Sequence, residues 1–285
     1  MEEEEGVETL KAGAGLGIRH YVLGQRISME EDVAHEFKGH RSISIHDIQN
    51  ICFNLNQAGA RTRNAISITI GAMLNSGQGG TIYLGVTDSG IVKGITLTRY
   101  QQDHVEASLE WTLGKFTPPV PDSRYSVAFV PVISSKSHTL SAVTSEHVDN
   151  IRRNQPHHVA QPYSCWCDVD AEAQQSLGKL PVVYVVEIHV RPWEPHNIKV
   201  PKNPLSTRVP LLPPMHLTET NCFYFRQSCR QTRLCLEDIR RLLVHRVQEH
   251  CTLKLDALQQ QFKMLQDLAE KHGIQLPLQT EENSH

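Results

Sequence analysis

Hydrophobic side chains follow a strand-like pattern in five separate stretches of the chain. Residues 181–190 are almost continuously apolar and β-branched, and residues 125–132 and 222–226 show the same character over shorter lengths. A Gly-rich turn precedes residues 81–86, and a second turn separates them from residues 91–95. These stretches predict strands, and a tight turn joins the strand at 81–86 to the one at 91–95.

Other stretches show the period of a helix. Residues 43–75 carry an interrupted apolar stripe, and Ser44 stands where an N-cap is expected. Residues 99–113 predict a second helix, and the pattern becomes helical again over residues 236–272. That last stretch carries a short heptad-like seam made of Leu255, Leu258, Phe262 and Leu265. Such a seam either packs on its own domain or pairs with a helix of a second copy or of another protein.

The remaining segments show no clear period. Residues 1–26 are acidic at the start and rich in glycine, and they predict a mobile lead-in. Residues 133–180 are rich in Ser, His and Gln and predict a long loop or insertion. Seven of the fifteen prolines lie in residues 192–214, which excludes regular structure there.

Composition limits the class of protein. The 285 residues are 39% hydrophobic and 21% charged, which is ordinary for a globular protein. The chain contains no apolar run of about 18 residues, so we expect no membrane span. The acidic start is unlike a signal peptide, and seven scattered cysteines are unlike a disulfide framework. We therefore expect an intracellular protein, cytoplasmic or nuclear, with reduced thiols.

Positive charge is concentrated in the second half of the chain. Residues 191–250 hold ten Lys and Arg against five Asp and Glu, a local charge of +5 in a chain whose net charge is −3. Such a stretch either binds phosphates or is simply a solvated basic surface. Its candidate RNA contacts are Arg226, Arg230, Arg233 and Arg240.

Carboxylates near the N-terminus suggest a metal site. In a strand over residues 34–38, Glu36 and Lys38 point to one face, and Glu31 precedes them. Asp88 follows the predicted strand 81–86 and either completes a set of three carboxylates or shapes its own turn. Carboxylates bind hard cations such as Mg²⁺ or Mn²⁺, and a lysine beside them can contact a phosphate. Taken alone, acidic and basic residues at this spacing usually form a solvated face.

Together these motifs resemble the Schlafen family. The sequence reads Glu31, four residues, then Glu-Phe-Lys; later comes Asn-Ser-Gly-Gln-Gly-Gly, an apolar strand, and Gly-Val-Thr-Asp ending at Asp88. Residues 222–233, Cys-Phe-Tyr-Phe-Arg-Gln-Ser-Cys-Arg-Gln-Thr-Arg, resemble the motif that closes the family's domain. The likeness extends over roughly residues 28–243, and the short length with a terminal helix resembles the short forms of the family.

The resemblance implies a fold and an activity. The fold is α+β: a single Schlafen/AlbA-type unit with a mixed sheet and flanking helices, followed by a coiled-coil helix. This divides the chain into a flexible N-terminus (1–26), a domain (27–243, with the insertion 133–180), and a helix with its tail (244–285). In active relatives two glutamates and an aspartate cut tRNA-like RNA; here those roles fall on Glu31, Glu36 and Asp88, beside Lys38, with Mg²⁺ or Mn²⁺ as the metal.

The sequence departs from the family in three ways. The family's structural zinc site uses a His-x-Cys and a Cys-Cys pair in two strands, and the matching strands here lack both. Cys165 and Cys167, with His157 and His158, are an alternative zinc site because thiolate and imidazole suit that metal. The glycine of the closing motif is replaced by Ser228 or Cys229. The chain has no internal repeat, so the RNA groove that larger relatives build from two units requires a second chain.

A glycine-rich segment suggests a further ligand. Backbone N–H groups in such a loop can bind phosphates, and ATP binding is often inferred for the family. No Gly-x4-Gly-Lys-Ser/Thr motif is present, however, and a tight turn accounts for the glycines without ATP. The candidate nucleotide loop comprises Gly71, Asn75, Ser76, Gly77, Gly79 and Gly80.

Three functions remain in competition. The first is a metal-dependent endoribonuclease, which the complete set of carboxylates favours. The second is a non-catalytic RNA-binding or ATP-binding regulatory protein, and the third is an assembly subunit that recruits a partner through its terminal helix. The missing zinc pattern and the single unit favour the second and third.

Overall fold

The computed structural model describes residues 9–11, 17–48, 64–134, 149–160, 165–179, 182–193 and 213–273. It divides the chain into two units, residues 1–234 and residues 235–285. The expected boundary at residue 243 therefore lies inside the terminal helix, which begins at Leu236. No helix within the described ranges is long and apolar enough to cross a membrane.

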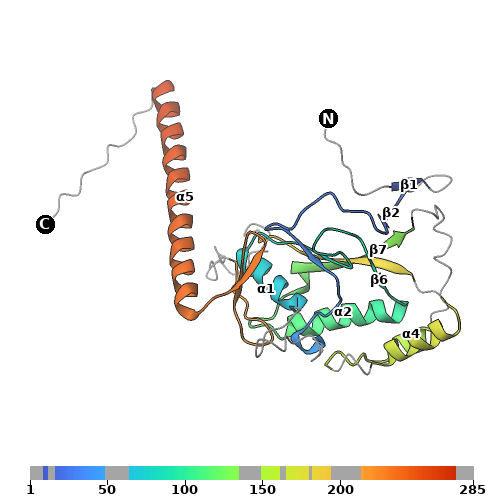
Figure 1. Cartoon of the computed structure of the whole chain (residues 1–285). Coiled ribbons are helices and arrows are strands. Elements are labelled where there is room, and N and C mark those ends of the chain that lie inside the picture. The colour runs from blue at the N-terminus through green and yellow to red at the C-terminus, as the bar shows by residue number, and fades with distance from the viewer. Residues whose placement is uncertain are drawn as a thin grey trace. The chain divides into compact units, whose positions relative to one another are not determined.

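The first unit is built on a six-stranded mixed sheet (Figure 1). Its main strand order is β3-β7-β8-β5-β4, and β6 pairs with β8 beside that path. The strands are β3 (Tyr21–Val22), β4 (His35–Lys38), β5 (Gly80–Leu84), β6 (Ile95–Thr96), β7 (Tyr125–Ile133) and β8 (Val183–Val190). β4 runs parallel to β5, while β8 runs antiparallel to both β5 and β7. The α+β class is therefore confirmed.

Two helices cover one face of this sheet. They are α1 (Ile66–Ser76) and α2 (Arg99–Gly114), and their buried side chains form one core with Ile82, Leu84 and Ile188. The apolar residues of α2 recur at helical spacing, and a capping box between Thr98 and Gln101 fixes its start.

The N-terminal segment covers the opposite face. Tyr21 and Ile27 pack there with Phe37 and Tyr83. The buried carboxylate of Glu187 accepts hydrogen bonds from Arg19 at 2.7 and 3.0 Å and from the Tyr21 hydroxyl at 2.6 Å. The part of the expected lead-in from residue 17 onward is therefore part of the domain, held by the half-exposed Arg19 and the buried Glu187.

Shorter elements complete the first unit. β1 (Thr9–Lys11) pairs with β2 (Gly17–Arg19), and β9 (Tyr224–Gln227) forms a hairpin with β10 (Arg230–Arg233). The 3-10 helices η1 and η3 span Ile45–Asp47 and Asp122–Arg124. Ser44 caps η1 as expected, and the rest of the expected helix up to Ile66 lies largely outside the described residues.

The expected loop 133–180 contains two helices. They are α3 (Asn150–Arg153) and α4 (Trp166–Ser176), and α4 lies beside α2 (Figure 1). The prediction of a loop was wrong for α4, because this helix buries only Cys167 and Asp170 and so has almost no apolar period.

The second unit consists of the helix α5 (Leu236–Lys271). The predicted helix is confirmed. Its seam residues Leu255, Leu258, Phe262 and Leu265 are 50–61% exposed in this single chain.

Candidate functional site

The first two predicted catalytic residues lie on the parallel pair β4–β5. Glu36 and Lys38 occupy alternate positions of β4, next to Ile82 and Leu84 of β5. Alternate residues of a strand share a face, and Lys38 Nζ indeed donates to Glu36 Oε1. Glu36 is only 4% exposed, so this carboxylate is fixed in position.

Glu31 reaches the same place from the preceding loop. Its Oε1 accepts the backbone N–H of Phe37 at 2.8 Å. Burial raises the pKa of Glu31, and the negative charges of Glu36 and Asp88 raise it further, while the Phe37 N–H and Lys38 oppose them. Glu36, Lys38 and Asp88 therefore all act electrostatically on Glu31.

Asp88 lies in the turn that follows β5. Thr87 closes this turn: its carbonyl accepts the Gly90 N–H at 2.8 Å, and its hydroxyl contacts Ser89 and Ile91. The Asp88 side chain is exposed. The turn thus carries a solvated carboxylate, whose negative charge acts on Glu31.

Arg226 secures the other side of Glu36. Its Nη1 donates to Glu36 Oε2 at 2.8 Å, and both side chains are buried, at 0% and 5% exposure. The same guanidinium donates to the carbonyl groups of Asp32, Val33 and His35. Arg226 was predicted to contact RNA, but the structure turns it inward, where it anchors the loop that leads into β4.

The other predicted RNA contacts remain on the surface. Arg230 and Arg233 are exposed on β10, and Arg240 is exposed on α5, where it pairs with Glu237 at 3.0 Å. Three of the four predicted RNA contacts, Arg230, Arg233 and Arg240, are therefore exposed.

The glycine-rich segment has packing roles throughout. Gly71 lies inside α1 against Phe116, and the side-chain amide of Asn75 is bonded to the backbone of His216 and Tyr224. A Cβ on Gly79 would lie 2.4 Å from the Val190 carbonyl oxygen, and one on Gly80 would lie 2.5 Å from that of Ala34. These glycines are needed because two backbones pass them closely.

The position of this loop also disfavours a nucleotide. Phosphate loops precede a helix, whose N-terminal N–H groups point at the anion. Here Ser76 ends α1, Gly77 is its C-cap, and Gly79 and Gly80 follow. Carbonyl groups and the negative end of the helix dipole face this loop, which opposes a phosphate.

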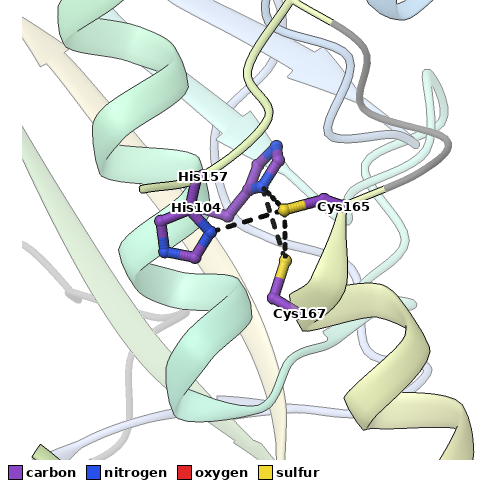
Figure 2. A group of neighbouring side chains, drawn as sticks. All are labelled: His104, His157, Cys165 and Cys167. Atoms are coloured by element: carbon purple, nitrogen blue, oxygen red, sulfur yellow. Dashed lines mark hydrogen bonds between the residues drawn. The ribbon is translucent and has the colours of Figure 1, made fainter. Parts of the chain in front are cut away.

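A second constellation joins α2 to the insertion. Among the residues that the structure describes, only one set of three or more His, Cys, Asp or Glu has ligand atoms within 4.8 Å of one another. It consists of His104 of α2, His157 of the loop after α3, and Cys165 and Cys167 at the start of α4, and we term it the His/Cys cluster (Figure 2).

The His/Cys cluster differs from the predicted zinc site in one ligand. His158 was the expected fourth member, but it contributes its backbone N–H, which donates to Cys165 Sγ at 3.5 Å. The fourth side chain is His104, more than fifty residues earlier in the chain, and no sequence spacing pointed to it. Burial lowers the pKa of His104 to about 4, and His157 adds to this; burial also raises the pKa of the Cys167 thiol.

A comparison with protein families matches residues 21–159 to a model described as "Schlafen-like domain, nematodes". The match begins at the first residue of β3 and includes Glu31, Glu36, Lys38 and Asp88. These residues carried the resemblance in the sequence; the structure pairs Glu36 with Lys38 on β4 and bonds Glu31 to the backbone N–H of Phe37 between them. Residues 21–159 therefore form a Schlafen-like domain, and this domain contains Glu31, Glu36, Lys38 and Asp88.

Proposed function

We propose that this chain is an RNA-binding Schlafen-type protein, and that Glu31, Glu36 and Asp88 make it a metal-dependent endoribonuclease acting on structured, tRNA-like RNA. The observation that carries the proposal is the pairing of Glu36 with Lys38 on one face of β4, with Glu31 bonded to the Phe37 N–H between them. The negative charges of Glu36 and Asp88 raise the pKa of the partly buried Glu31, and a cation is the partner that would relieve this repulsion.

The donor set fits Mg²⁺ or Mn²⁺. Hard cations take carboxylate oxygens as ligands, and all three candidate groups are carboxylates. Such an ion would supply Lewis-acid stabilisation of the phosphate that is cut. The oxygen atoms of the three carboxylates do not all lie within 4.8 Å of one another. Binding of a cation would therefore draw Asp88 or Glu31 toward Glu36.

The chain's own residues then have distinct tasks. Glu36 is held by Arg226 and cannot move far, so it is the fixed ligand. Asp88 lies on an exposed turn and is the ligand free to approach. Lys38 carries a positive charge that can pair with a phosphate oxygen, and Arg230 and Arg233 add two positive charges on β10.

The test is cleavage of end-labelled tRNA by the full chain, with Mg²⁺, with Mn²⁺ and with EDTA. Glu31→Gln and Asp88→Asn keep the size of the side chain and remove the charge, and each should reduce cleavage by at least about 100-fold if a metal ligand is lost. Glu30→Gln is the matched control, because Glu30 is the exposed neighbour of Glu31 and pairs only loosely with Arg26. Equal cleavage by all three variants would refute the assignment.

Assembly is the second candidate function, and the exposed seam of α5 favours it. Leu255, Leu258, Phe262 and Leu265 follow heptad-like spacing and are at least half exposed in the single chain. We propose that a second copy or another protein covers this seam. Light scattering of the full chain and of a chain lacking residues 250–285 tests the first of these: a monomeric mass for both would exclude self-association through α5.

A further inference from the structure

The four side chains of the His/Cys cluster have the spacing of a tetrahedral metal site. His104 Nδ1 lies 3.3 Å from Cys165 Sγ and 3.4 Å from Cys167 Sγ, while the two sulfurs are 3.4 Å apart. His157 Nδ1 lies 3.6 Å from Cys165 Sγ. Metal–ligand bonds of about 2.0–2.3 Å at tetrahedral angles separate the ligand atoms by about 3.3–3.8 Å. Figure 2 shows the four side chains turned toward one common point.

From this geometry we propose that His104, His157, Cys165 and Cys167 bind one zinc ion, and that this ion is structural. Two thiolates and two imidazoles are a recurrent ligand set for Zn²⁺. With four protein ligands no position is left for water or substrate, which is the mark of a structural rather than a catalytic site.

Charge balance supports the assignment. His104, Cys165 and Cys167 are buried, so a site with net charge would be costly there. Two thiolates and two neutral imidazoles around a divalent ion give zero net charge. Cys165 is the N-cap of α4 and Cys167 lies in its first turn, where the helix dipole favours negative sulfur.

An outer layer of contacts holds the ligands in place. Trp166 stacks on His157, with ring centres 5.0 Å apart, and its Nε1 donates to the Pro156 carbonyl at 3.2 Å. Asp168 accepts hydrogen bonds from Gln101 of α2 and from Arg41, each at 2.6 Å. Trp166 lies between the two cysteines and Asp168 follows the second, so these contacts restrain both thiols. Such contacts around the ligands tune metal affinity.

The insertion would benefit from such a metal site because its described residues, 149–160 and 165–179, bury few apolar side chains. Its apolar cluster consists of Cys165, Cys167 and Trp166 against Tyr100 of α2. Ile151, Val169 and Leu177 are 63–82% exposed. Small segments that cannot bury enough apolar surface are commonly stabilised by a metal. Zinc would thus attach α4 to α2 and so fix the chain between β7 and β8.

Metal analysis of the full chain, purified without added metal or chelator, provides the test. We expect about one zinc per chain by mass spectrometry of the metal, and near zero in Cys165→Ser, Cys167→Ser and His104→Ala. The His157→Ala variant should lose zinc as well. The His158→Ala variant, altered at the exposed neighbouring residue, should keep it. Cys229→Ser, at an exposed cysteine of the β9–β10 turn, is the matched thiol control.

Two further measurements guard against variants that fail to fold. Reconstitution of the unaltered chain with Co²⁺ should give the visible absorption of a tetrahedral ion and a sulfur-to-cobalt band. Chelation should speed amide hydrogen exchange in α4 while β5 and β8 stay protected. A metal-free chain with both thiols intact, a Cys165–Cys167 disulfide, or zinc lost equally from the His157 and His158 variants would each overturn the proposal.

Discussion

Replacing Arg226 by alanine should destabilise the domain far more than it weakens direct contact with RNA. The change removes the guanidinium that pairs with Glu36 at 2.8 Å in a region where both side chains are buried. It also removes the donors to three backbone carbonyl groups: those of Asp32 and Val33 in the loop before β4, and that of His35 at the start of β4. The loop that carries Glu31 then loses its anchor.

The expected size follows from these contacts. Removing one partner of a buried ion pair costs about 3–5 kcal/mol, because the other charge stays buried without compensation. Lys38 still pairs with Glu36, which lessens that cost, while the carbonyls that lose their donors add to it. We therefore expect about 3–5 kcal/mol, which for a domain of this size corresponds to a fall in Tm of roughly 6–20 °C.

Urea and thermal unfolding of the full chain would measure the loss, with Arg230→Ala as the matched control. Arg230 is exposed four residues later in the same hairpin, so its removal should change stability by less than about 0.5 kcal/mol. A double-mutant cycle with Glu36→Gln should give a coupling energy of about 0.5–3 kcal/mol. The reasoning fails if Arg226→Ala unfolds within about 0.5 kcal/mol of the unaltered chain and shows no coupling to Glu36.

Four further outcomes are expected. Glu31→Gln should raise Tm at pH 7 but not near pH 4. The pKa of Glu31 is raised in the folded chain, so the protonated carboxyl stabilises the fold at low pH, and this contribution is lost as the pH rises through the folded pKa. Arg230→Glu should weaken RNA binding and lower the slope of log affinity against log salt by about 0.7–0.9 in magnitude, as measured by titration at several salt concentrations. Gly80→Ala should lower stability by more than about 1 kcal/mol in urea because its φ is 148° and its Cβ would meet a carbonyl, whereas Gly39→Ala, with open space around it, should not. Leu258→Asp in the α5 seam should lower the mass seen by light scattering without lowering the Tm of the domain.

Local pattern was a good guide wherever burial is periodic. The strand predicted at 125–132 matches β7 except for its last residue, and the strand predicted at 181–190 contains β8. Both strands pair with each other in the sheet and are rich in apolar side chains. The helix predicted at 99–113 differs from α2 by a single residue at its C-terminal end. Its apolar stripe packs against the sheet, so sequence period and tertiary contact agree.

Elements held by polar contacts escaped the pattern. α4 is fastened by thiols, by Asp168 and by an ion pair of Asp170 with Arg152 at 2.7 Å, and none of these leaves an apolar period. The segment around Tyr21 is fixed by Glu187, which lies 166 positions later in the chain. Periodicity reports apolar burial only, so it cannot detect an element that depends on ion pairs.

Some residues of the candidate sites could likewise be placed from the sequence, and others could not. Glu36 and Lys38 could be placed on one face from strand geometry alone, and the structure pairs them. The inward position of Arg226 could not be foreseen, since a basic residue in a basic stretch looks like a surface residue until its partner Glu36 is known. His104 likewise gave no sign, because a ligand from a distant helix has no characteristic spacing to the Cys-x-Cys pair.

Two metals with different tasks would change how a nuclease assay must be interpreted. A strong chelator would remove both a cation at the carboxylates and zinc at the His/Cys cluster, so lost cleavage in EDTA alone does not identify a catalytic ion. The ligand chemistry separates the two sites: oxygen donors exchange Mg²⁺ or Mn²⁺ readily, whereas thiolates and imidazoles favour zinc. Adding Mg²⁺ back to the chelated chain, with and without zinc, therefore distinguishes them. Rescue by Mg²⁺ alone assigns the ion to Glu31, Glu36 and Asp88, and rescue that also requires zinc shows that cleavage depends on the insertion being fastened to α2.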